Sequence, residues 1–138
     1  MMAYFLAKTD PETYSIEQLA RDQETPWDGV RNAQAVASIK CMRPGDTVLI
    51  YHSMGVAAIV GVACVTSEPR PDPRDAKSWM VDMAFVSQFA EPVTLRAIKE
   101  CHQFDDWSLV RQSRLSTMSA PESFIAWLRE HYPTNTLA

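Results

Sequence analysis

The chain has 138 residues, of which 46% are hydrophobic and 22% are charged, so its composition is that of one globular domain with a single core. Its 13 Lys and Arg against 17 Asp and Glu give a net charge of −4, which excludes a general basic field for holding a nucleic-acid backbone. Any binding of an anion therefore has to depend on a local group of positively charged side chains.

The N-terminal third alternates extended and helical segments. Residues 3–8 predict a strand, which ends at a turn-forming Thr-Asp-Pro sequence. Ser15 with Gln18 three residues later is a capping box and predicts a short helix. Residues 33–42 have apolar positions at helical spacing, so they predict a second helix with Asn32 as its N-cap.

Residues 26–34, Pro-Trp-Asp-Gly-Val-Arg-Asn-Ala-Gln, fit neither a helical nor a strand period. They gather an indole, a carboxylate, a guanidinium and two carboxamides around Gly29, which supplies backbone freedom. Such a loop can line a pocket for a flat, polar molecule, or it can seal the edge of a core with Trp27. The loop residues alone favour neither interpretation.

The middle of the chain predicts three strands. Residues 47–53 and the apolar run 57–65 are strand-like, and Gly61 inside the second run is typical of a strand that bends. Residues 68–75 hold three of the nine prolines and are expected to be an exposed loop. Residues 79–86 alternate in side-chain type and predict a further strand.

The C-terminal part is expected to be mainly helical. Residues 94–102 predict a helix, 104–109 a loop or short extended piece, and 111–118 an extended segment. Ser119 with Glu122 is a second capping box, which predicts a final helix. The apolar residues expected to be buried on this helix are Phe124, Ile125, Leu128 and Tyr132.

Four or five strands with short helices between them, and bulky apolar residues on both strand faces, predict a small curled sheet. A mixed barrel with peripheral helices fits this pattern, and an open α+β sheet is the alternative.

Three widely spaced cysteines, Cys41, Cys64 and Cys101, favour neither a disulfide framework nor a zinc knuckle. We expect each to be a small apolar core residue in a reducing compartment. The chain shows no signal-peptide core and no run near the roughly 20 apolar residues of a membrane span. It is therefore expected to be soluble and cytoplasmic, or nuclear in a eukaryote, and not secreted.

Catalysis has little support in the sequence. The neighbours Cys101 and His102 would point in different directions on a helix, and the three histidines lie too far apart in sequence for paired metal ligands. No glycine-rich phosphate loop is present, and Asp105-Asp106 is more typical of a turn than of an acid–base pair. We therefore expect no cofactor, no metal and no enzyme activity; a hydrolase or nuclease is the weaker alternative.

Binding of a nucleobase is better supported. Trp27, Tyr51 and Trp79 provide flat rings on which bases can stack, although Tyr51 and Trp79 are individually more typical of a core. The side chains suited to base edges are Arg31, Asn32, Gln34 and Gln112, and the candidate phosphate contacts are Arg111, Arg114 and Lys8.

Blocks along most of the chain are similar in order and spacing to those of a known family. They are residues 4–11, 14–16, 27–32, 51–53, 59–61, 79–82 and 109–116. The Trp-Asp-Gly-Val-Arg-Asn block and the Arg-Gln-x-Arg-Leu-Ser block are the most specific. Together they resemble the EVE domain family, with residues 1–138 as a single domain.

The resemblance implies a PUA-like fold of the α+β class, a curled β-pseudobarrel of about five strands with peripheral short helices, and kinship with YTH and ASCH domains. It also implies a non-catalytic reader that accommodates a modified nucleobase, such as a methylated or hydroxymethylated base in DNA, in an aromatic pocket. DNA is the expected partner, with no membrane and with a monomer favoured. The alternative is an RNA or modified-nucleoside binder that uses the same pocket.

The resemblance also assigns site residues by position. Those implied to border the nucleobase are Lys8, Thr9, Trp27, Asp28, Arg31, Asn32, Tyr51, His52, Ser53 and Trp79. Arg111, Gln112 and Arg114 are implied to approach the nucleic-acid backbone or the pocket rim. Phe5 stands where family members usually have Trp, and its smaller ring without an N–H is expected to affect ligand choice.

Overall fold

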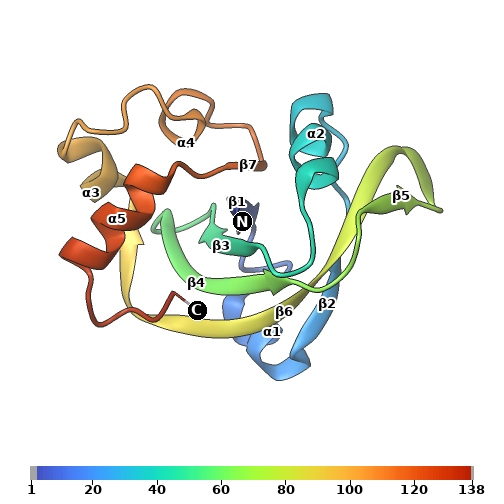
Figure 1. The fold of residues 1–138 in the computed structure, drawn as a ribbon, viewed down its shortest axis with the longest axis horizontal. Helices are drawn as coiled ribbons and strands as arrows, with labels where there is room; N and C mark the ends of the chain where they lie inside the picture. Colours follow the sequence, from blue (N-terminus) through green and yellow to red (C-terminus); the bar gives the residue numbers. More distant parts are fainter. Residues whose placement is uncertain (1–2, 138) are drawn as a thin grey trace.

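The computed structural model describes residues 3–137, which form one mixed sheet of seven strands with short helices around it (Figure 1). The elements are β1 (Tyr4–Thr9), α1 (Ile16–Asp22), β2 (Glu24–Trp27), α2 (Ala33–Cys41), β3 (Thr47–His52), β4 (Ala58–Val65), β5 (Arg70–Asp72), β6 (Asp75–Thr94), α3 (Leu95–Glu100), α4 (Ser108–Arg111), β7 (Thr117–Ser119) and α5 (Glu122–His131). The predicted curled sheet with peripheral helices is confirmed.

The sheet is built around the long strand β6. The strand order is β2-β6-β4-β3-β1-β7, and β5 pairs with β6 beside this path. β1 runs parallel to β3, whereas the other pairs are antiparallel. The register shifts along the β3–β4 and β4–β6 pairs, and such irregularities bend and twist a sheet. The structure has two strands more than the predicted five, because β2 and β5 have only four and three residues and no readable period. Pro26 and Trp27, predicted as part of a loop, belong to β2, where they pair with Asp82 and Val81 of β6.

Local signals predicted both N-terminal helices correctly. The Ser15 hydroxyl accepts the Gln18 backbone N–H at 3.2 Å, and the Gln18 side chain accepts the Ser15 N–H at 2.9 Å. Asn32 caps α2 by accepting the N–H groups of Gln34 and Ala35 at 2.9 and 3.1 Å. Both caps satisfy donors that have no partner within the helix, so the predicted helix starts are confirmed.

Gly61 allows α1 to pack closely on the sheet. A Cβ atom at this position would lie 2.6 Å from the Ser87 carbonyl oxygen and 2.6 Å from the Ile16 Cδ1 atom. Both distances are shorter than any normal contact, so only glycine fits between β6 and α1 here. The predicted bend in this buried strand has the same origin, because the β4–β6 register shifts at Gly61.

Two predictions for the C-terminal part are wrong. Residues 111–118 are not an extended strand, because α4 ends at Arg111 and β7 begins only at Thr117. Ser119 does not cap a helix: it pairs with Phe5 in the sheet, and Pro121 is the N-cap of α5 without a side-chain hydrogen bond. The Ala120 N–H donates to the Tyr4 carbonyl at 2.8 Å. Pairing with β1 thus overrides the local capping signal.

Three further predictions need correction. Residues 68–75 are not a simple loop, because β5 lies within them and pairs with β6. Cys41 is exposed and Cys64 and Cys101 are half-buried, so none of the cysteines belongs to the fully buried core. Tyr132 ends α5 as its half-buried C-cap, whereas Phe124, Ile125 and Leu128 are buried as predicted.

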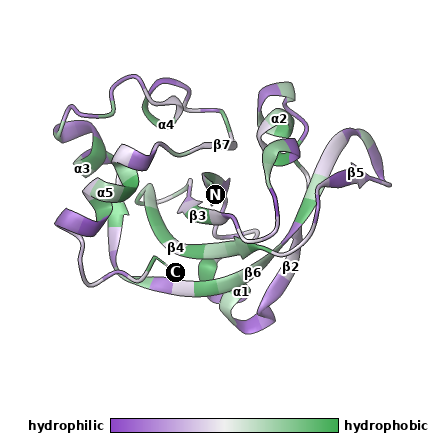
Figure 2. Cartoon of the chain, viewed as in Figure 1, coloured by the Kyte–Doolittle hydropathy of each residue, from purple (hydrophilic) through white to green (hydrophobic). Residues whose placement is uncertain are grey.

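Hydrophobic residues follow β4 and part of β6, and the β5–β6 hairpin is mainly hydrophilic (Figure 2). Helices α3, α4 and α5 gather at one side of the sheet, away from α2 (Figure 1). Four aromatic rings join this group: Phe124 lies 5.1 Å from Phe104, 4.6 Å from Trp107 and 5.6 Å from Trp127, measured between ring centroids. No helix within residues 3–137 is both long enough and apolar enough to cross a membrane.

Candidate functional site

A pocket of about 410 Å³ opens where the end of β1 meets β2 and the loop that follows β2. This volume lies within the range of pockets that bind small organic molecules. The lining residues are Lys8, Thr9, Thr13, Tyr14, Thr25, Pro26, Trp27, Asp28, Gly29, Val30 and Ser116. They come from four separate segments of the chain, so the pocket exists only in the folded protein.

Two aromatic side chains form one wall. Trp27 is the last residue of β2 and pairs with Val81 of β6, and only 8% of its surface is exposed. The edge of the Tyr14 ring meets it with centroids 6.2 Å apart and planes at 84°. The Tyr14 hydroxyl donates to the Asp22 carboxylate at 2.8 Å, and burial together with this neighbour raises the pKa of Tyr14. Trp27 therefore serves both the core and the pocket.

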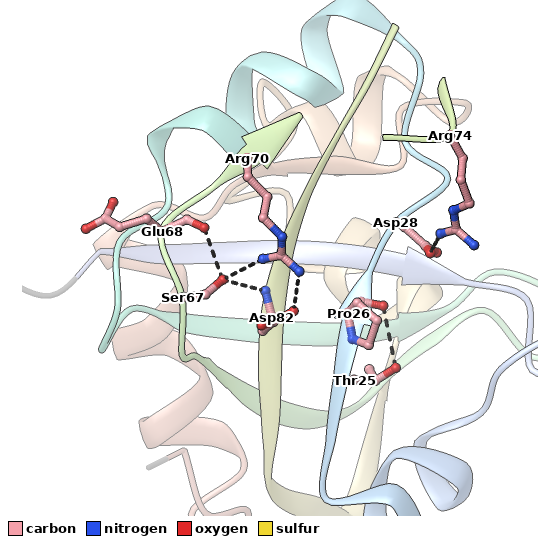
Figure 3. Close-up of polar contacts among 8 residues, drawn as sticks. All are labelled: Thr25, Pro26, Asp28, Ser67, Glu68, Arg70, Arg74 and Asp82. Atoms are coloured by element: carbon pink, nitrogen blue, oxygen red, sulfur yellow. Dashed lines mark hydrogen bonds and ion pairs between the residues drawn. The ribbon is translucent and has the colours of Figure 1, made fainter. Parts of the chain in front are cut away.

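Lys8 and Asp28 bring opposite charges to the lining. The Lys8 ammonium group donates to the Ser113 carbonyl at 3.0 Å and lies 5.4 Å from the Tyr51 ring centroid. Burial lowers the pKa of Lys8 from its usual value. The Asp28 carboxylate pairs with Arg74 from the β5–β6 turn, and the two side chains point toward each other in Figure 3. A cation and a carboxylate in one pocket can contact both donors and acceptors of a polar ring.

Of the residues predicted for this site, Lys8, Thr9, Trp27 and Asp28 line the pocket. The segment 51–53 lies at the end of β3, which pairs with β1. Tyr51 is 3% exposed, and the Ser53 N–H donates to the Thr9 carbonyl at 3.0 Å. These residues support the end of β1 and are not part of the lining.

Arg31, Asn32 and Trp79 lie elsewhere. Arg31 forms an ion pair with Asp75 at 2.7 Å, and it lines a second groove together with Trp79. The Asn32 side-chain oxygen is already bound by two N–H groups of α2. The structure therefore divides the predicted base-binding set between the pocket and the α2 side of the molecule.

The predicted backbone-binding residues lie on the segment that leads to the rim. Arg111 contacts Asp106 at 3.3 Å, and the Gln112 amide contacts the Ser108 hydroxyl at 3.4 Å. Arg114 is exposed and forms no ion pair within residues 3–137. The segment reaches the pocket at Ser116, whose carbonyl accepts the Lys8 N–H at 2.8 Å.

The predicted list of single site residues leaves out seven of the lining residues: Thr13, Tyr14, Thr25, Pro26, Gly29, Val30 and Ser116. Tyr14 and Ser116 lie inside blocks that resemble the EVE family, and three others belong to the loop 26–34, which the sequence already presented as a possible pocket wall. The sequence therefore carries a signal for these five. Thr13 and Thr25 carry no such signal, because an isolated threonine is common in any surface turn.

The stability of this region is expected to depend on pH through His52. Its Nε2 atom accepts the Ile16 backbone N–H at 3.1 Å, so the ring must be unprotonated at that atom. Burial lowers the pKa of His52, with an opposing influence from Glu17.

We expect the free energy of unfolding to fall as the pH drops below about 6.5, because the unfolded chain then takes up the His52 proton before the folded protein does. The loss should level off below the folded pKa. His52→Gln should lose less stability than the wild type between pH 7.5 and 5.5 in urea unfolding, since His102 and His131 are unchanged in both. If both proteins lost the same stability over this pH range, the pH dependence would come from groups other than His52.

The pocket lining contains no histidine or cysteine. The Cys101 thiol donates to the Ile98 carbonyl, and the His102 ring contacts Asp105 at 3.2 Å. Within the described part of the chain, no three His, Cys, Asp or Glu side chains cluster closely enough to hold a metal ion.

A family model described as the EVE domain matches residues 3–131. Among curated proteins, thymocyte nuclear protein 1 from Rattus norvegicus is 32% identical, over 72% of this chain and 57% of that protein. The chain thus spans little more than half the length of this relative.

Solved structures show the same fold. A protein from Rhodopseudomonas palustris is 32% identical with a TM-score of 0.88, over 96% of this chain and 94% of that one. A crystal structure of human THYN1 protein in complex with DNA containing 5-methylcytosine has a TM-score of 0.82 at 26% identity, over 93% and 98% of the two chains.

Proposed function

The chain belongs to the EVE domain family, and from this we propose that it is a non-catalytic reader of DNA that takes a modified base into the pocket beside Trp27. The observation that carries the proposal is the combination of an indole wall with Lys8 and Asp28 in one cavity of about 410 Å³. The complex of the human relative with methylated DNA supports DNA as the ligand class.

The chemistry of the lining suits an extruded cytosine derivative. Stacking on an aromatic side chain stabilises a bound base by about 1–3 kcal/mol, and the part of Trp27 that stays exposed borders the cavity. Carboxylates accept hydrogen bonds from the exocyclic amine of cytosine, a role open to Asp28. The Lys8 ammonium can donate to a ring carbonyl. Val30 and the threonine methyl groups offer an apolar niche for a 5-methyl substituent.

Base extrusion also agrees with the acidic composition. A protein with a net charge of −4 gains little from the general field of duplex DNA, so its affinity has to come from specific contacts. Placing a base in a pocket requires unstacking, which costs a few kcal/mol, and enclosed stacking with hydrogen bonds can offset this. Discrimination would then reside in the pocket, and the rest of the surface would add affinity without reading sequence.

The test compares labelled oligonucleotides of one sequence that differ at a single cytosine. Fluorescence anisotropy at one stated salt concentration would measure Kd for DNA with cytosine, 5-methylcytosine or 5-hydroxymethylcytosine, and for the matching RNA. We expect one modified DNA to bind about tenfold tighter than unmodified DNA, the size expected of one additional methyl-sized group in an apolar niche. Equal Kd values for all DNAs would overturn the proposal, and preference for RNA or a free nucleoside would redirect it.

The same samples test the absence of catalysis. We expect every oligonucleotide to keep its mass after prolonged incubation with repurified protein. A mass change that scales with protein concentration would contradict a purely binding role.

A further inference from the structure

We propose that the groove between α2 and the start of β6 binds the phosphate backbone next to the base held in the pocket. This inference rests on the proposed function and adds a second contact surface to it. The groove, which we call the α2 groove, has a volume of about 380 Å³. Its lining residues are Arg31, Ala33, Val36, Ala37, Lys40, Ala76, Lys77 and Trp79.

The α2 groove is locally basic in an acidic protein. Its lining contains three cationic side chains and no carboxylate, although the whole chain carries a net charge of −4. Arg31 is paired with Asp75, whereas Lys40 and Lys77 are exposed and form no ion pair within residues 3–137. Two unpaired ammonium groups beside one cavity are a suitable contact for phosphate oxygens.

Trp79 holds one of these cations in place. The Lys40 ammonium lies 4.6 Å from the centroid of the Trp79 ring, a distance typical of a cation–π contact. Since Lys40 covers a face of the ring, Trp79 acts here as a positioning residue for the cation. The alanines at 33, 37 and 76 line the groove with small side chains, which leaves room for a sugar–phosphate chain to approach the lysines.

The pocket and the α2 groove share one loop. Val30 lines the pocket, and the next residue, Arg31, lines the groove. Trp27 and Arg31 are four residues apart, so their Cα atoms are at most about 14 Å apart. A strand with one base beside Trp27 can therefore reach the groove with the phosphates of the nearest nucleotides. The first N–H groups of α2 are not available for this contact, because Asn32 binds them.

The test removes the two free lysines together. We expect Lys40→Ala/Lys77→Ala to weaken binding of modified and unmodified DNA by the same factor, about tenfold at low salt. The slope of log K against log salt should become shallower by about 1 to 2, because roughly 0.9 is lost per phosphate contact on duplex DNA. Both side chains are exposed, so the melting temperature should stay near that of the wild type.

A charge-matched control is Lys99→Ala/Arg129→Ala, which removes two exposed cations that line neither the pocket nor the α2 groove. We expect it to change Kd by less than threefold and to leave the salt slope intact. If Lys40→Ala/Lys77→Ala loses no more affinity than this control, or if only the preference for the modified base changes, the α2 groove is not a backbone contact.

The outcomes separate this inference from the proposed function. A wild type without preference for modified DNA, combined with the predicted loss of affinity and salt slope in the lysine variant, would overturn the reader function and support the groove. If the wild type prefers modified DNA and Lys40→Ala/Lys77→Ala binds DNA as tightly as the wild type does, the reader function is supported and the groove is overturned. A wild type that binds no DNA would overturn both.

Discussion

Trp27→Phe is expected to weaken binding of 5-methylcytosine-containing DNA by about tenfold, because the smaller ring loses stacking area and the indole N–H. Phenylalanine remains flat and apolar, so the free energy of unfolding should fall by no more than about 1–2 kcal/mol. Alanine is unsuitable for this test. Trp27 is 8% exposed and packs against Tyr14, and its truncation should cost about 3–5 kcal/mol of stability.

The matched control is Trp107→Phe. Trp107 is 9% exposed, belongs to the aromatic cluster near α5 and does not line the pocket. The Trp107→Phe variant should lose stability, partly because the indole N–H of Trp107 donates to the Ser119 carbonyl at 2.9 Å. The variant should nevertheless bind DNA as the wild type does. Anisotropy and urea unfolding on both variants would decide. Full binding by Trp27→Phe would leave Trp27 with a packing role only.

Phe124→Ala is expected to cause the largest loss of stability, about 3–5 kcal/mol in the free energy of unfolding. The side chain is fully buried, and its ring contacts Phe104, Trp107 and Trp127. Aromatic pairs of this kind add about 0.5–1.5 kcal/mol beyond the area that they bury. Urea unfolding followed by tryptophan fluorescence would measure the change.

Phe85→Ala makes the same chemical change at a half-buried position of β6. We expect it to lose clearly less stability than Phe124→Ala, because part of the Phe85 ring stays in water in the folded protein. Similar losses for the two variants would mean that the aromatic cluster at α5 is not a main source of stability in this fold.

Local chemistry explains which elements could be predicted. Ser15 with Gln18 and Asn32 with its helix act within a few residues, so their signals are complete in the sequence. The apolar runs of β3 and β4 are buried whatever their partners, and their predicted positions agree closely with the structure. The bounds of the short strand β7 could not be predicted: the extended segment expected at 111–118 is reduced to Thr117–Ser119, because only these residues pair with β1, more than a hundred residues earlier.

The candidate site shows the same division. The composition of residues 26–34 predicts a loop that could line a pocket, and Trp27 and Asp28 do line one. Phe5, where family members usually have Trp, is buried in β1 and does not reach the pocket lining. Family position groups Tyr51 and His52 with the base contacts, but β3 places them behind β1.

The family, the starts of the two N-terminal helices, the buried strands and the irregular loop after Trp27 could all be recognised in the sequence, because each has its signal in short local blocks or patterns. Which side chains share a site depends instead on the tertiary structure. The Lys8 ammonium meets the carbonyl of Ser113 across 105 residues, whereas Trp79 lies past the end of β2 and turns to Lys40 of α2. Such neighbours are chosen by strand pairing and helix packing over long sequence distances, and no local pattern encodes them.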